Sequence, residues 1–330
     1  MPTESLTEKA LKLLNEKSAK ARTMAKKAIL EEKTGIKKVD DAVEQYLSKW
    51  DDTTRPGMLL LACEAVGGNP EEVVPLQAAL LFIDATMDIH DDIIDESIAK
   101  KNRKTVYGKL GKETTLLLGD GFMVKGFTHL HKALEKAPKD RSLQIIDEVD
   151  HFLSEVVEAH ISEAPLKAKK WRVEPEAYLQ VLTKKASDIE GRMKIGAIYG
   201  GGSAGNVKAL GRYGRIMGIL LAVKSEFVDV FEPSELMHRM KYEILPLQVL
   251  YALQNRKHGT RIREILQKDH LSQNDCNQLI DIIDVAKENA WLTLQLKSLE
   301  KEAIQIINTF PNSQVKKELQ LLVASLTEDL

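Results

Sequence analysis

Prolines are rare enough in this 330-residue chain to leave three long intervals in which helices can run without interruption. The intervals are residues 76–137, 176–232 and 247–310. Proline inside a helix removes a backbone hydrogen bond and clashes with the preceding turn. Clean alternating runs of valine, isoleucine and threonine, which would indicate half-buried strands, are missing. The sequence therefore predicts an all-α protein with no substantial sheet.

Apolar residues recur at three- and four-residue intervals in two segments, as on the buried face of an amphipathic helix. In residues 139–164 they are Leu143, Ile146, Val149, Leu153, Val156 and Val157. In residues 289–310 they are Leu292, Leu296, Leu299, Ala303, Ile306 and Phe310. We interpret residues 1–35, which are charged and rich in lysine, as an N-terminal helical arm that is exposed or packed against a partner. Residues 36–330 are then a single all-helical domain.

Composition excludes several classes of protein. Lysine and arginine number 47 against 49 aspartate and glutamate, so the chain has no overall positive charge with which to bind nucleic acid. Two cysteines cannot build a disulfide framework or a cysteine-rich zinc site, which favours a reduced, cytoplasmic location. The apolar run Ile216–Val223 is far shorter than the roughly 20 residues that span a bilayer, so we expect no transmembrane segment.

A stripe of carboxylates runs along LLFIDATMDIHDDIIDES at 80–97. With about 100° of rotation per residue, a helix there brings five acids onto one face. They are Asp84, Asp88, Asp91, Asp92 and Asp95. Like charges at this spacing repel one another, and hard divalent cations such as Mg²⁺ or Mn²⁺ are natural counterions for carboxylates. Asp91 and Asp95 can jointly bridge metal ions, with Asp92 in support. A solvated acidic face is the alternative.

Basic residues follow the stripe directly, at Lys100, Lys101, Arg103 and Lys104. An acidic stripe beside a basic cluster suits a metal-bridged diphosphate, because the cations neutralise oxygens that the metal ions do not reach. The alternative is an ordinary charged loop.

The segment DDIID at 91–95 resembles the first aspartate-rich motif of the trans-isoprenyl diphosphate synthases, the farnesyl and geranylgeranyl diphosphate synthase family. Four further segments resemble that family in the same order, so the resemblance extends from about residue 40 to the end. They are RPGMLLLACEAVGG (55–68), KTVYGKLGKETTLLLGDGF (104–122), LGRYGRIMGILLAVKSEFVDVFE (210–232) and LPLQVLYAL (245–253).

The resemblance implies a helical bundle around a deep apolar cavity. It also implies a prenyltransferase of isoprenoid biosynthesis that ionises an allylic prenyl diphosphate with Mg²⁺ or Mn²⁺. The prenyl group then passes to isopentenyl diphosphate or another acceptor. Members of the family suggest a homodimer, or a heteromer with a related subunit.

Roles follow from the resemblance for several residues. Implied metal ligands are Asp91, Asp92, Asp95, Glu226 and Asp229. Implied diphosphate-binding residues are Arg55, Lys100, Lys101, Lys184 and Lys241. Implied catalytic residues are Asp91, Asp95 and Lys184. Implied cavity residues are Thr86, Met87 and His160.

Some positions depart from the family pattern. Asp52 and Thr53 replace the lysine and arginine of the acceptor signature, and Asp84 replaces a histidine or glutamine. Ser225 stands at the first position of the second aspartate motif. These changes predict weak binding of isopentenyl diphosphate and leave a hydroxyl or aromatic acceptor open. Two other functions also stay open: a non-catalytic subunit of a heteromeric synthase, and a terpene cyclase-like diphosphate lyase.

Overall fold

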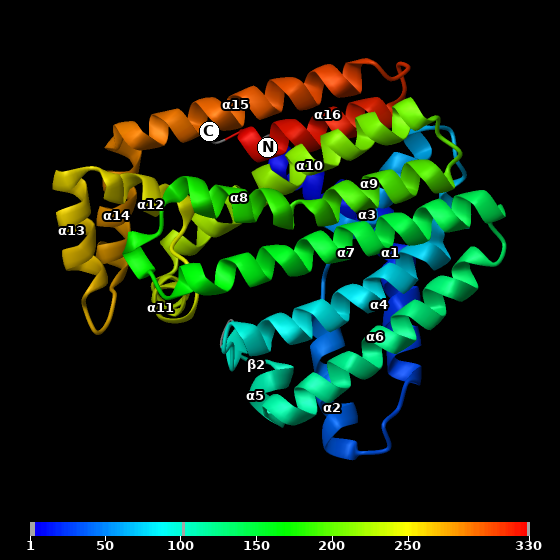
Figure 1. The fold of residues 1–330 in the computed structure, drawn as a ribbon, viewed down its shortest axis with the longest axis horizontal. Helices are drawn as coiled ribbons and strands as arrows, with labels where there is room; N and C mark the ends of the chain where they lie inside the picture. The colour runs from blue at the N-terminus through cyan, green and yellow to red at the C-terminus, as the bar shows by residue number, and fades with distance from the viewer. Residues whose placement is uncertain (1–3, 101–102, 329–330) are drawn as a thin grey trace. The chain divides into compact units, whose positions relative to one another are not determined.

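The computed structural model describes residues 4–100 and 103–328, and helices dominate them (Figure 1). The strands among these residues are two short ones, β1 (Ala99–Lys100) and β2 (Arg103–Lys104), which pair antiparallel. The prediction of an all-α protein is therefore confirmed. The hairpin was not predicted, because two-residue strands are too short to show alternation. Lys101, a predicted diphosphate ligand, lies outside the described residues.

The chain divides into two compact units. The first, here called the aspartate unit, comprises the described residues of Leu11–Asp147 and Arg192–Val207. The second, here called the C-terminal unit, comprises the described residues up to Ala10, Glu148–Gly191 and those from Lys208 onward. The aspartate stripe lies in the first unit and the predicted second motif in the other.

The aspartate unit is built mainly from the first six helices. They are α1 (Leu6–Glu31), α2 (Lys37–Lys49), α3 (Thr54–Ala65), α4 (Pro70–Ile94), α5 (Val106–Leu110) and α6 (Lys112–Leu134). The start of α7 (Lys139–Lys167), the end of α9 (Ser187–Tyr199) and the start of α10 (Ala204–Val228) complete it. Residues 21–29 of α1 contribute buried alanine and isoleucine side chains to its core, so this part of α1 is a packed helix.

Helix α4 is the central element of the aspartate unit and packs most extensively on α6, beside which it lies in Figure 1. The rings of Phe82 and Phe122 meet edge to face with their centroids 5.5 Å apart. Gly126 on α6 permits this approach, because a Cβ atom there would lie 2.7 Å from Cγ1 of Ile83. A larger residue at position 126 would push the two helices apart.

Capping hydrogen bonds and a proline account for where α4 begins and ends. The Asn69 side chain accepts a hydrogen bond from the backbone N–H of Glu71, and Pro70 occupies the first turn. The helix ends at Ile94, and the Asp95 backbone N–H donates to the carbonyl of Asp91 at 2.9 Å. By length and composition α4 could cross a membrane, but 72% of its apolar window is buried inside the protein.

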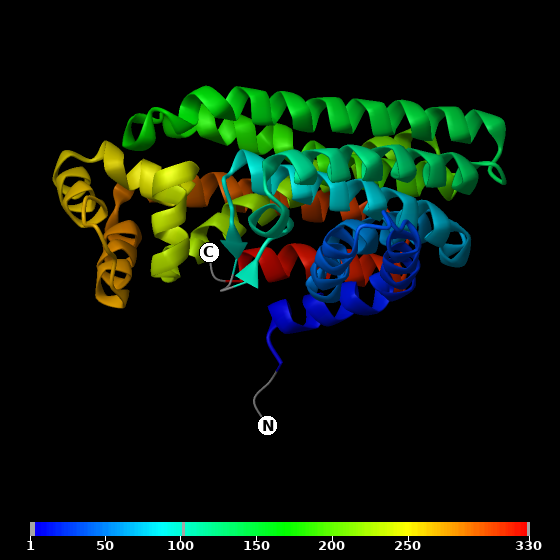
Figure 2. The ribbon, with the colours of Figure 1, turned by 90° about the horizontal axis from the view of Figure 1, so that it is seen from below.

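The C-terminal unit contains the rest of α7, the start of α9, most of α10 and the remaining helices. These are α8 (Pro175–Lys185), α11 (Pro233–Tyr242), α12 (Leu247–Gln254), α13 (Arg256–Leu266), α14 (Gln273–Val285), α15 (Lys287–Asn308) and α16 (Gln314–Thr327). Two 3₁₀ turns, η1 (Lys170–Arg172) and η2 (Asp229–Phe231), also belong to it. Helices α15 and α16 pack along one another (Figures 1 and 2). The Tyr213 hydroxyl donates to the Leu319 carbonyl at 2.8 Å, which joins α10 to α16.

The two segments with helical periodicity are helices, α7 and α15. On α7, however, three residues of the predicted apolar face, Leu143, Ile146 and Val157, are exposed. The buried stripe instead consists of Ile145, Val149, Phe152, Val156 and Ala159. Apolar residues thus occupy two sides of α7, and periodicity alone does not tell which side is covered.

Candidate active site

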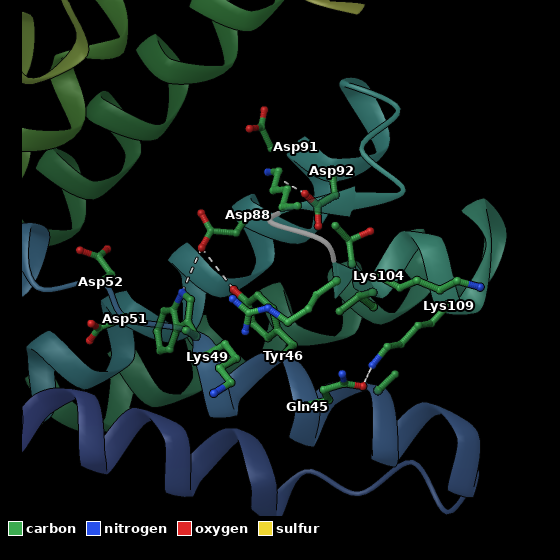
Figure 3. A pocket seen from close by; sticks show the side chains of 16 residues that line it. Gln45, Tyr46, Lys49, Asp51, Asp52, Asp88, Asp91, Asp92, Lys104 and Lys109 are labelled. Atoms are coloured by element: carbon green, nitrogen blue, oxygen red, sulfur yellow. Dashed lines mark hydrogen bonds and ion pairs between the residues drawn. The ribbon is translucent and has the colours of Figure 1, made fainter. Parts of the chain in front are cut away.

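A pocket of about 440 Å³ opens in the aspartate unit where α4 ends (Figure 3). Helix α2, the segment after it, α4, the hairpin and α5 supply its walls. The acids that line it are Asp51, Asp52, Asp88, Asp91 and Asp92. The bases that line it are Lys49, Lys100, Arg103, Lys104 and Lys109. In Figure 3, Asp51 and Asp52 lie on one side of Asp88, and Lys104 and Lys109 lie on the other.

Asp88 is held by two aromatic donors at the centre of this pocket (Figure 3). The Tyr46 hydroxyl and the Trp50 indole nitrogen both donate to Asp88 Oδ2, at 3.2 and 3.0 Å. Burial raises the pKa of Asp88, against the opposing charge of Arg55. The two donors stand four residues apart at the end of α2, so a helical reading of that segment would have placed them on one face.

Above pH 3.8, the ordinary pKa of aspartate, we expect the wild-type protein to lose stability relative to an Asp88→Asn variant. Burial raises the pKa of Asp88, so the folded protein keeps a proton that the unfolded chain releases. The free energy of unfolding therefore falls as pH rises from 3.8 to the raised pKa of Asp88 in the folded protein. Urea unfolding of both proteins at a series of pH values measures the difference. A wild-type protein that gains stability relative to the variant would contradict this assignment.

Asp92 contacts the basic cluster through an ion pair with Lys100. Lys100 Nζ lies 2.8 Å from Asp92 Oδ1, and the dashed line that ends at the labelled Asp92 in Figure 3 marks this pair. Burial raises the pKa of Asp92, although Lys100 opposes the shift. For Lys100, the charge and hydrogen bond of Asp92 outweigh burial and raise its pKa. The structure thus brings together a predicted metal ligand and a predicted diphosphate ligand.

Asp84 lies deeper in α4 and does not line the pocket. Its side chain is only 2% exposed, and Oδ1 lies 2.5 Å from Nη2 of Arg192, which is 1% exposed. Within the stripe, repulsion is therefore offset by protein groups: Arg192 at Asp84, two aromatic donors at Asp88 and Lys100 at Asp92. Arg192 carried no signal in the sequence, because it lies 108 residues from Asp84.

Three cations of the pocket differ from the others. Lys49, Arg103 and Lys104 line it, and their side chains make no hydrogen bond or ion pair with another described residue. By contrast, Arg55, a predicted diphosphate ligand, contacts Asp52 at 2.8 Å. Lys109 donates to the Gln45 side chain. The pocket therefore presents positive charge that a bound anion can neutralise.

Asp91 and Asp95 fit the role of divalent-metal ligands. Asp91 lines the open pocket, and Asp95 follows it by one turn at the helix end. In the described part of the chain, no three histidine, cysteine or acidic side chains converge to form a ready-made ion cage. Mg²⁺ commonly binds through one or two carboxylates together with substrate phosphates, so a complete protein cage is not required.

In the C-terminal unit, Glu226 and Asp229 stand at the end of α10 and in η2. Arg239 of α11 contacts both acids, with its Nε 2.7 Å from Asp229 Oδ2 and its Nη1 3.6 Å from Glu226 Oε1. The Tyr178 hydroxyl also donates to Glu226 Oε1. Burial raises the pKa of Glu226 to about 7, against the opposing effects of Arg239 and Tyr178.

The remaining predicted residues are spread over both units. Lys184 contacts Glu158 at 3.2 Å on the surface of the C-terminal unit. His160 lies 3.7 Å from the buried Glu163, and Lys241 lies over the ring of Tyr242. In the aspartate unit, Thr86 is fully buried and Met87 half-buried, and neither lines the pocket at the end of α4. Their predicted roles stay predictions.

Known proteins resemble this chain in sequence. The geranylgeranyl diphosphate synthase of Methanosarcina mazei is 32% identical over 188 residues, 57% of each chain. The short chain isoprenyl diphosphate synthase of Methanothermobacter thermautotrophicus is 29% identical over 195 residues, 59% of each chain. The matched region thus spans less than two thirds of these relatives.

The fold is also similar to that of solved proteins. The geranylgeranyl pyrophosphate synthetase of Pyrococcus horikoshii superposes with a TM-score of 0.84 at 22% identity, over 98% of this chain and 99% of the other. At that identity the likeness establishes the fold. The family model of polyprenyl synthetase matches residues 36–283, well over half of the chain. The family resemblance read from the aspartate motif is thus confirmed, and the chain belongs to the polyprenyl synthetase family.

Proposed function

We propose that the protein is a trans-prenyltransferase of isoprenoid biosynthesis that depends on Mg²⁺ or Mn²⁺ and uses an allylic prenyl diphosphate. The observation that carries this proposal is the pocket of the aspartate unit, where Asp91 lines the same space as Lys49, Arg103 and Lys104. Carboxylates for a divalent ion and uncompensated cations for phosphate oxygens are the two requirements of diphosphate binding.

Each group has a distinct task in this proposal. Asp91 and Asp95 hold the metal, which when bound neutralises charge on the departing diphosphate. Lys100 holds Asp92 in place and offers its remaining N–H donors to phosphate oxygens. Diphosphate contacts by Arg55, Lys101, Lys184 and Lys241 are part of the proposal, as are Thr86, Met87 and His160 as residues that line the prenyl cavity.

Isopentenyl diphosphate is the acceptor that the pocket favours. The sequence suggested a weakened acceptor site, because Asp52 and Thr53 replace a lysine and an arginine. Lys49, Arg103 and Lys104 return positive charge to the same pocket. An uncharged hydroxyl or aromatic acceptor would not need these cations. Relatives named geranylgeranyl and short chain isoprenyl diphosphate synthases support the same choice.

The direct test is an incubation with Mg²⁺ and allylic diphosphates of 10, 15 and 20 carbons, with and without isopentenyl diphosphate. We expect products longer by five carbons, formed only when both Mg²⁺ and isopentenyl diphosphate are present. A matched reaction with EDTA is the control for metal dependence. Transfer that proceeds equally in EDTA, or an absence of both product and allylic diphosphate binding, would refute the proposal.

A non-catalytic subunit of a heteromeric synthase is the second candidate. It is favoured by the contacts of Arg239 with Glu226 and Asp229, because these acids correspond to the second aspartate motif. This candidate predicts that the purified chain binds an allylic diphosphate but forms no product. Activity would then appear only after a related subunit is added.

We propose a cytoplasmic protein that self-associates through α6. Leu117, Val124 and Phe127 lie along one side of α6, and Leu117 is 70% exposed. Leu143 and Ile146 at the start of α7 are exposed as well. Exposed apolar residues seven and three positions apart share one side of a helix, and such a seam is typical of a helix that packs on a second copy.

A Leu117→Glu/Val124→Glu variant should therefore be monomeric, because two buried charges in the seam would lack partners. Light scattering after gel filtration measures the mass. Leu294→Glu, at a residue 66% exposed on α15, is the matched control and should leave the mass unchanged. A wild-type protein that is already monomeric would contradict the proposed seam.

A further inference from the structure

Arg239 is surrounded by acidic groups within the C-terminal unit. Its guanidinium contacts Asp229, Glu226 and Glu243, the last through Nη1 at 3.3 Å from Oε2. Nη1 also donates to the Ile244 carbonyl at 3.3 Å. The Arg239 side chain is only 13% exposed. A single fixed cation thus contacts three carboxylates that belong to different segments of the chain.

One carboxylate oxygen of each acid is already engaged by a protein donor. Asp229 Oδ2 accepts from Arg239 Nε, and Glu226 Oε1 accepts from the Tyr178 hydroxyl. Glu226 Oε2 is buried and has no hydrogen-bond partner among the described residues. Mg²⁺ gives up its water shell reluctantly and retains several waters when bound, so a buried oxygen suits it poorly.

Electrostatic repulsion by Arg239 also disfavours a metal ion at Glu226 and Asp229. An ion on Asp229 would stand close to the guanidinium, and a divalent ion is repelled twice as strongly as a monovalent one at the same distance. The backbone favours the arginine too, because α11 begins at Pro233 and returns Arg239 to the end of α10. The ten-residue separation makes this contact with Asp229 local.

We propose that Arg239 takes the place of a metal ion at Glu226 and Asp229, so that this acidic pair binds no Mg²⁺. The expectation from the sequence that both acids are metal ligands then does not apply to this chain. Metal binding depends on Asp91 and Asp95 in the other unit. The inference rests on the proposed function only for the choice of metal, since the contacts of Arg239 belong to this chain alone.

Equilibrium dialysis against Mn²⁺ tests the inference by counting ions bound per chain. The count is made first with Mn²⁺ alone and then with a non-hydrolysable thio analogue of farnesyl diphosphate. We expect Asp229→Asn to bind the same number of ions as the wild type in both conditions. Arg239→Gln should bind one more ion, because Glu226, Asp229 and Glu243 lose their shared cation.

Arg212→Gln is the matched control, since Arg212 contacts a single acid, Glu302, through two hydrogen bonds. It should bind the wild-type number of ions. One ion fewer in Asp229→Asn, or no gain in an Arg239→Gln protein that circular dichroism shows to be folded, would overturn the inference. If Arg239→Gln does not fold, the Asp229→Asn count decides. Failure of the proposed function is distinct: Asp91→Asn would then bind as many ions as the wild type.

Discussion

Replacing Asp91 by asparagine should lower kcat/KM for prenyl transfer by about 10²–10³-fold, the loss typical when one charge-stabilising group is removed from an active site. Asp91 lines the open pocket and, in the proposed function, binds the metal that neutralises the departing diphosphate. Asparagine keeps the shape of the side chain but removes its charge. The fold should therefore remain, and steady-state kinetics with saturating Mg²⁺ measures the change.

Asp41→Asn provides the control for this experiment. Asp41 is exposed on α2 of the same unit and does not line the pocket. Its substitution should leave kcat/KM unchanged. Thermal unfolding followed by circular dichroism shows whether both variants keep their helices. Full activity of Asp91→Asn at saturating Mg²⁺ would remove the assigned role of Asp91.

Replacing Arg192 by methionine should destabilise the protein by about 3–5 kcal/mol, because it leaves a buried carboxylate without its cation. Asp84 and Arg192 are both almost fully buried and lie within one compact unit. Methionine fills a similar volume, so the loss reports charge rather than a cavity. Urea unfolding of wild type and variant gives the difference in free energy.

The double variant Arg192→Met/Asp84→Leu distinguishes a buried charge from a packing defect. Apolar replacement of a whole buried ion pair is often neutral or stabilising. We therefore expect the double variant to recover most of the stability that the single variant loses. A double variant as unstable as Arg192→Met would show that packing around the guanidinium, and not its charge, determines the stability.

Helices were the part of this protein that sequence reasoning predicted well. Periodicity predicted α7 and α15 close to their observed ends, and helical rotation placed the acids of α4 on one face. The helical periodicity and the acidic face both depend on residues three or four positions apart. A helix brings such residues together whatever the rest of the chain does. The side of α7 that is covered was missed, because burial depends on elements distant in sequence.

The candidate site likewise combines features that local spacing predicted with contacts that only the packing of distant segments creates. DDIID and the basic residues after it predicted an acidic stripe beside a basic cluster, and the ion pair of Asp92 with Lys100, in the short strand soon after α4, came from the structure. The donors to Asp88 come from α2, about forty residues earlier. Lys49 approaches the pocket from that same helix. Neither contact follows from local spacing, so neither was assigned from the sequence.

The sequence by itself determined the helical class, the acidic face of α4 and the family. Each of these depends on the local order of residues or on motifs that survive without coordinates. The tertiary structure alone decided which charges meet: Arg192 with Asp84, and Arg239 with Glu226 and Asp229. An ion pair depends on distance in space and on burial, which lowers the screening by water. Whether a carboxylate faces a metal ion or an arginine is therefore settled only when the helices pack.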